Sequence, residues 1–394
     1  MKESLVENLV KSGVPSSKAL MQCDGIEREL ARCRILYVVG QLGIGGLERQ
    51  LYYLLASLDH AQYSPAVVVW NVNRSDKYYR DIAALNVPMY GFPPEWSPIS
   101  KLRAFRRLVK SIEPEVIHSY GFPTNFIAYY GALGTPAVPI GSLRADFSLS
   151  KVEDGAIRGA LNARWPSSHI SNSLTAAEAA RRHLGPFAPK RIIVVRNGLD
   201  LHQFSCSADT SRKRNYVAAI GSLLAVKRWD RLLRAIKETK TRIGEVRLRI
   251  AGDGPLRTAL GKLADDLGIS QTVEFLGAVH DIPSLLSGAK FLVHTSESEG
   301  CPNAVMESMA CGLPVVALKA GDIPYLVEEG RTGFLVNQDD AQSLADRITQ
   351  LLTDETLCVR MGAASREKAE REFGLERLIN ETLGAYRTAG WGKG

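Results

Sequence analysis

Short runs of apolar, β-rich residues alternate along the chain with longer segments in which apolar residues recur every three or four positions. The first run, Arg34–Val39, leads through a glycine loop into Leu47–Leu58, where leucines line one stripe of a helix. Further strands are predicted at 66–70, 87–90, 115–118, 138–142, 169–171 and 191–195, with helices near 76–85, 99–112 and 174–183. Strands alternating with helices predict βαβ crossovers and a parallel sheet.

The rhythm pauses in a polar segment at 206–214 and then restarts. Strands are predicted at 216–220, 246–251, 273–276, 290–294, 314–317 and 333–336, helices at 229–240, 255–267 and 303–311, and amphipathic helices from Ala341 onward. The prediction is an α/β chain: a helical extension at 1–33, Rossmann-like domains at 34–195 and 196–375, and a last helix at 376–394. Two such domains facing each other would form an interdomain cleft for a ligand.

Composition narrows the class of protein. The chain has 394 residues, 45% of them apolar, which is typical of globular proteins and excludes a disordered or collagen-like chain. The net charge of +7 is uneven, because residues 1–195 carry 23 basic and 16 acidic side chains while the remainder carry 26 of each. The six cysteines form neither a CxxC pair nor a zinc-ligand spacing, so reduced thiols of a cytoplasmic protein are expected.

The hydrophobic pattern also argues against a membrane span. The N-terminal segment lacks the apolar core of a secretory signal. The longest stretch without charged residues, Val116–Leu143, is interrupted by glycines and prolines. We therefore expect a cytoplasmic protein that is at most peripheral at the inner face of the cell membrane.

The most informative local pattern is a pair of glutamates eight positions apart. Glu299 would lie in the loop after a strand, and Glu307 one turn into the next helix. The backbone amides between them would meet an anion such as a diphosphate at the helix N-terminus, and a carboxylate can accept hydrogen bonds from a ribose. The alternative is a pair of ordinary surface glutamates.

Three further groups are candidates for the same chemistry. Gly45 and Gly46 follow the first strand and could expose amides to an anion, although a tight turn explains them equally well. This loop does not fit G-x-G-x-x-G, because Glu48 occupies the sixth position counted from Gly43, so a nicotinamide enzyme is disfavoured. Lys227 could neutralise a leaving phosphate, or simply be a solvated lysine.

His118 ends a predicted strand of the first domain, and Arg144 follows another. In an open α/β sheet, side chains at the carboxyl ends of the strands can reach a ligand. A buried structural histidine is the alternative for His118. The sequence contains no Asp-x-Asp motif, so no obligate metal is expected.

Together these features resemble the family-4 retaining glycosyltransferases, which have the GT-B fold. The resemblance covers about residues 34–375 and rests on Gly45-Gly46, Val116-Ile117-His118, the segment 196–200, Gly221 with Lys227, the segment 251–255, and above all Glu299–Glu307 continuing through 308–316. It implies transfer of a sugar from a nucleoside-diphosphate sugar, most often a UDP-sugar, to a hydroxyl of a glycan or lipid-linked acceptor. The reaction would serve polysaccharide or glycoconjugate synthesis, with retained configuration and without a cofactor.

The resemblance also implies residue roles. Glu299 would contact the donor sugar, His118 would face the reacting sugar, and Glu307 would hold the ribose. Donor diphosphate contacts would come from Lys227 and from amides of Gly45, Gly46, Gly300, Cys301 and Pro302, with Asn303 beside them. The N-terminal domain would bind the acceptor, and the last helix would cross back onto it. Many members have an arginine where this chain has Ser222; Arg228 and Arg144 are candidates to replace its charge.

Two other functions remain open from the sequence. A sugar-nucleotide epimerase of the same fold, or a non-catalytic protein that binds nucleotide sugars, would carry similar motifs. No nucleic-acid-binding motif is present. The basic first half could bind an anionic membrane surface, and its candidate patch is the helix with Lys101, Arg103, Arg106, Arg107 and Lys110, unless these are merely a solvated face.

Overall fold

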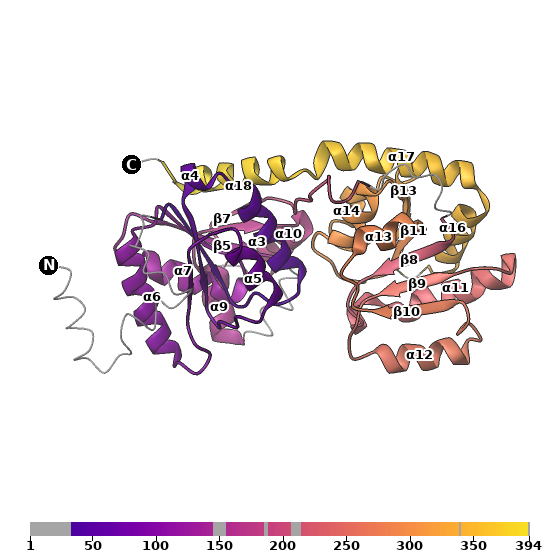
Figure 1. The fold of residues 1–394 in the computed structure, drawn as a ribbon, viewed down its shortest axis with the longest axis horizontal. Coiled ribbons are helices and arrows are strands. Elements are labelled where there is room, and N and C mark those ends of the chain that lie inside the picture. The colour runs from indigo at the N-terminus through magenta and orange to yellow at the C-terminus, as the bar shows by residue number, and fades with distance from the viewer. Residues whose placement is uncertain (1–32, 145–154, 185–187, 206–213, 339, 393–394) are drawn as a thin grey trace. The chain divides into compact units, whose positions relative to one another are not determined.

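The chain folds into two compact units (Figure 1). The computed structural model describes residues 33–144, 155–184, 188–205, 214–338 and 340–392. Unit 1 comprises the chain up to Arg196 and again from Leu378, and unit 2 comprises Asn197–Arg377. The predicted extension at 1–33 lies outside the described residues apart from Cys33, and so does most of the polar segment at 206–214.

Unit 1 is built on a seven-stranded parallel sheet in the order β3-β2-β1-β4-β5-β6-β7. Its strands are β1 (Ile35–Val39), β2 (Pro65–Val69), β3 (Met89–Gly91), β4 (Val116–Ser119), β5 (Val138–Leu143), β6 (Ser168–Ser171) and β7 (Arg191–Val194). The helices are α3 (Gly46–Ser57), α4 (His60–Tyr63), α5 (Lys77–Ala83), α6 (Pro98–Ile112), η1 (Phe122–Thr124), α7 (Asn125–Ala132), α9 (Ala156–Arg164), α10 (Leu174–Leu184) and most of α18 (Leu375–Ala389).

Unit 2 is built on a six-stranded parallel sheet in the order β10-β9-β8-β11-β12-β13. Its strands are β8 (Tyr216–Ile220), β9 (Leu248–Ala251), β10 (Val273–Gly277), β11 (Ala289–His294), β12 (Val315–Leu318) and β13 (Gly333–Val336). The helices are η3 (Ala225–Lys227), α11 (Trp229–Ile243), α12 (Arg257–Asp266), α13 (Ile282–Ser287), α14 (Asn303–Ala310), α15 (Ile323–Leu326), α16 (Ala341–Thr353) and α17 (Glu355–Glu372).

Both sheets have the doubly wound strand order, which confirms the predicted α/β fold. In each sheet the order reverses between two neighbouring strands, β1 and β4 in unit 1 and β8 and β11 in unit 2. Loops that leave these strands at their carboxyl ends diverge to opposite faces of the sheet and open a crevice, where ligands of such folds bind. The topology therefore directs attention to the loops after β1, β4, β8 and β11.

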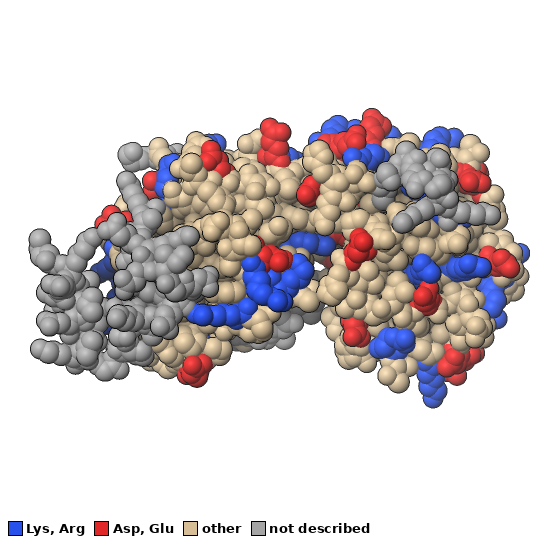
Figure 2. Space-filling model, in the orientation of Figure 1, with Lys and Arg blue, Asp and Glu red and all other residues tan. Residues whose placement is uncertain are grey.

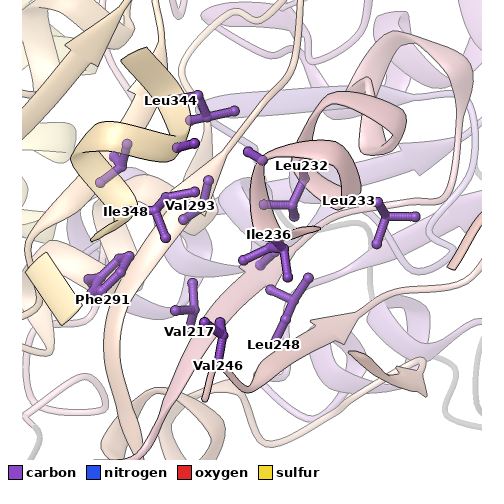
Figure 3. Close-up of a cluster of buried hydrophobic side chains, with 14 of the residues drawn as sticks. Val217, Leu232, Leu233, Ile236, Val246, Leu248, Phe291, Val293, Leu344 and Ile348 are labelled. Carbon is purple, nitrogen blue, oxygen red and sulfur yellow. The ribbon is translucent and has the colours of Figure 1, made fainter. Parts of the chain in front are cut away.

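The unit 2 core shows why the apolar rhythm dictates this packing. Strand residues such as Val217, Leu248 and Phe291 are fully buried or nearly so and meet Ile236 of α11 and Ile348 of α16 (Figure 3). Each strand of a parallel sheet is covered by helices on both faces, so its residues are apolar without alternation. The helices contribute one apolar stripe each, which is the period the sequence displays.

Some elements are not evident from sequence. Helices α7 and α13, with the sequences NFIAYYGA and IPSLLS, are short and carry little polar contrast between faces, so neither shows a helical period. The four described cysteines, Cys33, Cys301, Cys311 and Cys358, are buried and form no disulfide bond. Within the described ranges, no helix combines the length and apolarity needed to cross a bilayer.

The structure corrects the predicted basic patch on α6. Lys101 is buried, and its ammonium donates to Asn71 Oδ1 at 2.7 Å and to the Trp70 carbonyl at 3.1 Å. Arg103, Arg107 and Lys110 are exposed at helical spacing and form one face of α6. On the side shown in Figure 2, basic and acidic side chains are interspersed over unit 2, whereas in unit 1 several basic side chains gather in one group and others lie apart from it.

Candidate functional site

Two loops at the carboxyl edge of the unit 2 sheet are tied together. One follows β8 and carries Lys227, and the other follows β11 and carries Glu299. The Thr295 hydroxyl donates to the Lys227 carbonyl at 2.9 Å, and the Glu297 amide donates to the Val226 carbonyl at 3.0 Å. The sequence separates these loops by about 70 residues, and the sheet brings them together at its switch point.

One oxygen of Glu299 accepts two hydrogen bonds. Lys227 Nζ forms a close ion pair with Oε1, and His294 Nε2 donates to the same oxygen at 2.9 Å. The Glu299 side chain is 11% exposed and that of Lys227 21%. Burial alone would raise the pKa of Glu299, but the hydrogen bond from His294, together with the Lys227 ammonium, outweighs burial and lowers that pKa to about 2.

A glycine supports the backbone of this loop. Gly321 has a φ of +51°, and a Cβ atom on it would lie 1.9 Å from the Glu299 carbonyl oxygen. The next amide, that of Asp322, donates to the Gly300 carbonyl at 3.1 Å. Only a residue without a side chain allows this close approach, so the turn after β12 holds the segment that carries Glu299.

Helix α14 begins directly after this loop. Asn197 Nδ2 donates to the Cys301 carbonyl at 3.1 Å and to Asn303 Oδ1 at 2.9 Å, which fixes the start of the helix. The first turn, from Asn303, has backbone N–H groups without acceptors inside the helix, and these favour an anion. Glu307 lies one turn further on and is only 1% exposed.

Two details of the predicted diphosphate contacts need correction. Pro302 has no N–H and caps α14 with its backbone, so it contributes no donor. Cys301 is buried, with its thiol 3.5 Å from Met306 Sδ, so its side chain is part of the core. Among the predicted contacts, the amides of Gly300, Cys301 and Asn303 remain as candidates.

The loop that carries Lys227 packs against the turn after β9. Gly252 has a φ of +147°, and a Cβ on it would lie 1.8 Å from the Gly221 carbonyl oxygen. The Ser222 side chain is exposed, and its carbonyl accepts from the Trp229 indole at 3.0 Å. The segment 252–254 is therefore a structural support for the loop.

Arg228 is one candidate to replace the positive charge of the arginine that many family members have at the position of Ser222. Its guanidinium donates to both Asp230 oxygens at 3.1 Å and to Glu297 Oε2 at 3.1 Å. These hydrogen bonds, with that to Asp230 strongest, hold the pKa of Arg228 far above its usual value. An arginine engaged by two carboxylates carries little net positive field to a diphosphate, so the structure lends this candidate no support.

In unit 1, the glycines after β1 face a carboxylate of the chain itself. Gly45 caps α3 and Gly46 is its first residue. A Cβ on Gly45 would lie 2.3 Å from Glu48 Oε2, so the Glu48 side chain lies against the helix start. Burial raises the pKa of Glu48, and the charge of Asp76 raises it further. For an anion to bind at this helix start, the Glu48 side chain would have to move away or be protonated.

His118 is placed inside unit 1, not at its surface. The ring is 1% exposed; Nδ1 is 2.7 Å from the Tyr386 hydroxyl of α18, and Nε2 is 3.2 Å from the Ser142 hydroxyl. Burial, and then the charge of Arg144, lower the pKa of His118 well below its usual value. This geometry fits an anchor for α18, in line with the structural alternative, and the contact of His118 with the reacting sugar stays a prediction.

Arg144 is likewise engaged within unit 1. Its guanidinium carbon lies 3.7 Å from the centroid of the Tyr120 ring, a cation–π contact. The residue is half-buried at the end of β5. Its predicted part in a phosphate clamp gains no support from this contact.

The unit 2 residues thus form the stronger candidate site. Lys227 and Glu299, which is 11% exposed, lie on the loops after the neighbouring strands β8 and β11, and the buried Glu307 lies in the helix that follows. A lysine, two carboxylates and a helix N-terminus at one sheet edge suit a nucleoside diphosphate. His294 and Gly321 also belong to this site, but neither carries a motif of its own that would predict this from the sequence. No group of three or more His, Cys, Asp or Glu side chains suited to a metal lies in the described part of the chain.

Comparison with solved structures defines the class. HepE of Anabaena, solved in complex with UDP, matches with a TM-score of 0.76 and 20% identity, over 90% of this chain and all of that one. Sucrose-phosphate synthase of Thermosynechococcus elongatus matches with a TM-score of 0.73 and 18% identity, over 91% and 99% of the two chains. The fold is that of the GT-B glycosyltransferases.

Sequence comparison gives the family. The model for glycosyl transferases group 1 matches residues 207–368, and that for glycosyltransferase family 4 matches residues 44–203. N-acetyl-α-D-glucosaminyl L-malate synthase of Bacillus anthracis is 30% identical over 46% of this chain and 48% of its own length. The lipopolysaccharide core glycosyltransferase LpsE of Rhizobium meliloti is 30% identical over 44% and 50%. These matches span about half of each relative, and with the two family models they establish that the chain belongs to the family-4, group 1 glycosyltransferases.

Proposed function

We propose that this protein transfers a sugar from a UDP-sugar to a hydroxyl of a glycan or lipid-linked acceptor. The observation that carries the proposal is the convergence of Lys227, Glu299 and the start of α14 at the switch point of unit 2. UDP as the nucleotide is supported by HepE, which was solved with UDP and with UDP-glucose. Relatives that act in lipopolysaccharide core synthesis in Rhizobium meliloti and are assigned to colanic acid biosynthesis in Escherichia coli support a polysaccharide or glycoconjugate product.

The site must stabilise the negative charge that develops on UDP as it leaves. Lys227 and the amides at the start of α14 would meet the diphosphate, and Glu307 would accept hydrogen bonds from the ribose. In the structure described, Lys227 is paired with Glu299, so donor binding has to draw the ammonium from that carboxylate to the diphosphate. Glu299 would then contact hydroxyls of the donor sugar.

The protonation state of Glu299 bears on the stereochemistry. The hydrogen bond from His294, which does not depend on Lys227, lowers the pKa of Glu299, and a carboxylate with a lowered pKa is a poor proton acceptor at neutral pH. The proton of the acceptor hydroxyl would instead pass to the leaving phosphate, with attack on the face that UDP leaves. This step forms the new glycosidic bond, breaks the sugar–phosphate bond and retains the anomeric configuration.

Donor specificity can be tested by ligand-induced stabilisation. A ligand at a hundred times its Kd should stabilise the folded protein by about 2.7 kcal/mol. UDP should raise the melting temperature, while GDP and ADP at the same concentration should not. Stabilisation by GDP or ADP alone would refute the uridine assignment.

Once the nucleotide is identified, the chemistry can be tested with sugar donors that carry it. The anomeric configuration of the product, read from its NMR coupling constants, should match that of the donor; inversion would refute the mechanism. We also propose that no metal is required. Loss of activity in EDTA, with recovery on adding Mg²⁺ or Mn²⁺, would overturn that proposal.

We further propose that unit 1 binds an anionic membrane surface at the cytoplasmic face. The support is the exposed basic face of α6, formed by Arg103, Arg107 and Lys110. Binding to phosphatidylglycerol-containing vesicles should occur at low salt, fall at high salt, and weaken in R103E/R107E. Absence of binding at low salt would remove the membrane proposal and leave the transferase proposal intact.

A further inference from the structure

His294 is a buried polar side chain to which the proposed mechanism assigns no direct role. It is the last residue of β11, and its side chain is 5% exposed. Its Nε2 lies 2.9 Å from Glu299 Oε1. Because an ionised carboxylate only accepts, the Nε2 of His294 carries the proton in this hydrogen bond.

The two partners of Glu299 differ in how firmly they are held. Lys227 ends a short 3-10 helix and carries a flexible four-carbon stem, so its ammonium can move from one anion to another. His294 belongs to a central strand that pairs with β8 and β12, and its ring is enclosed by the core. The imidazole therefore cannot follow Lys227 when that side chain changes partner.

The ligand creates a conflict for Lys227. One ammonium cannot give its strongest ion pair to both Glu299 and a diphosphate. If Lys227 turned to the diphosphate and nothing else held Glu299, a carboxylate that is almost wholly buried would lose its compensating partner. The enzyme needs a second donor that stays in place.

We propose that His294 is a positioning residue, which holds the Glu299 carboxylate toward the donor sugar while Lys227 transfers its ion pair to the donor diphosphate. The catalytic consequence of this inference rests on the proposed function, whereas the hydrogen bond between His294 and Glu299 is observed independently of it. The hydrogen bond from His294 also lowers the pKa of Glu299, and among the influences on that pKa only the opposing effect of burial is larger. Loss of His294 should therefore act on Glu299 and not on nucleotide binding.

Two substitutions at this position separate positioning from packing. His294→Leu removes the hydrogen-bond donor and substitutes an apolar side chain of comparable size. His294→Gln retains an N–H group near the position of Nε2. We expect H294L to reduce kcat for UDP-glucose hydrolysis by at least about tenfold, while the Kd for UDP changes by less than about twofold. H294Q should recover most of the lost turnover.

A second measurement does not depend on catalysis. The pKa of Glu299 can be followed by ¹³C NMR with labelled glutamate, and its signal assigned by its absence in Glu299→Gln. We expect this pKa to rise by about one pH unit or more in H294L and to stay low in H294Q. Wild-type protein that neither binds UDP nor hydrolyses UDP-glucose would refute the proposed function, and the pKa series would still decide the positioning contact.

The outcomes that overturn the inference are specific. An unchanged Glu299 pKa in H294L would show that His294 does not hold the carboxylate. Equal kcat in H294L and wild-type protein would show that the contact is catalytically irrelevant. A parallel loss of UDP affinity and turnover in both H294L and H294Q would indicate general damage to unit 2.

Discussion

Replacing Gly321 with alanine should disturb the site through the backbone of Glu299. The added Cβ would lie 1.9 Å from the Glu299 carbonyl oxygen, and approaches under 3.0 Å are essentially never seen for real Cβ atoms. Both partners are backbone or rigidly attached to it, so the segment must move by about 1 Å, a displacement that can cost about a hundredfold in rate. G321A should therefore lose about two orders of magnitude in turnover.

The matched control is Gly330→Ala in the same unit. Gly330 also has a positive φ, +74°, but a Cβ there would meet nothing within 4 Å. Both variants carry the left-handed strain of an alanine, about 1–2 kcal/mol, and each kcal/mol lowers the melting temperature of a domain of this size by about 2–4 °C. Only G321A carries the clash as well.

Thermal unfolding and UDP-glucose hydrolysis measure the two effects. We expect G330A to melt slightly lower than wild-type protein and to keep its turnover, and G321A to melt lower still and to lose turnover. Equal melting temperatures and equal turnover in the two variants would refute the close approach between Gly321 and Glu299. If G321A were less stable but fully active, the placement of Glu299 would not matter for the reaction.

Three further predictions concern other parts of the molecule. Glu307→Ala should weaken UDP binding by about tenfold or more in calorimetry, since the ribose would lose an acceptor; unchanged affinity would exclude the ribose role. Tyr386→Phe leaves the buried His118 Nδ1 without its partner and should lower the free energy of unfolding of unit 1 by about 1–3 kcal/mol in urea, with UDP affinity unchanged. Because the pKa of Glu299 is depressed, its stabilising contribution is full above pH 4.5 and is lost as pH falls toward about 2, so acid unfolding of Glu299→Gln should show a shallower pH dependence over that range than wild-type protein.

The sequence could predict the architecture because parallel α/β packing leaves a periodic record. The fully apolar run of β1 and the striped helix after it require a sheet covered on both faces, and the same rhythm repeats in both units. Helices without contrast between their faces, such as α7, leave no such record. The Glu299–Glu307 pattern was visible because a loop and the helix that follows it are contiguous in the chain.

Tertiary structure alone decided which side chains meet. His118 and His294 both end or nearly end a strand, and no local pattern separates them. The fold buries His118 against Tyr386, 268 residues away, and places His294 against Glu299. Likewise, the demand for glycine at position 321 arises from a backbone that passes beside it after a crossover. Sequence by itself determined the two sheets and the loops that carry the motif, because burial follows local periodicity. The partners of each polar group depend on contacts between distant segments, which only the folded chain defines.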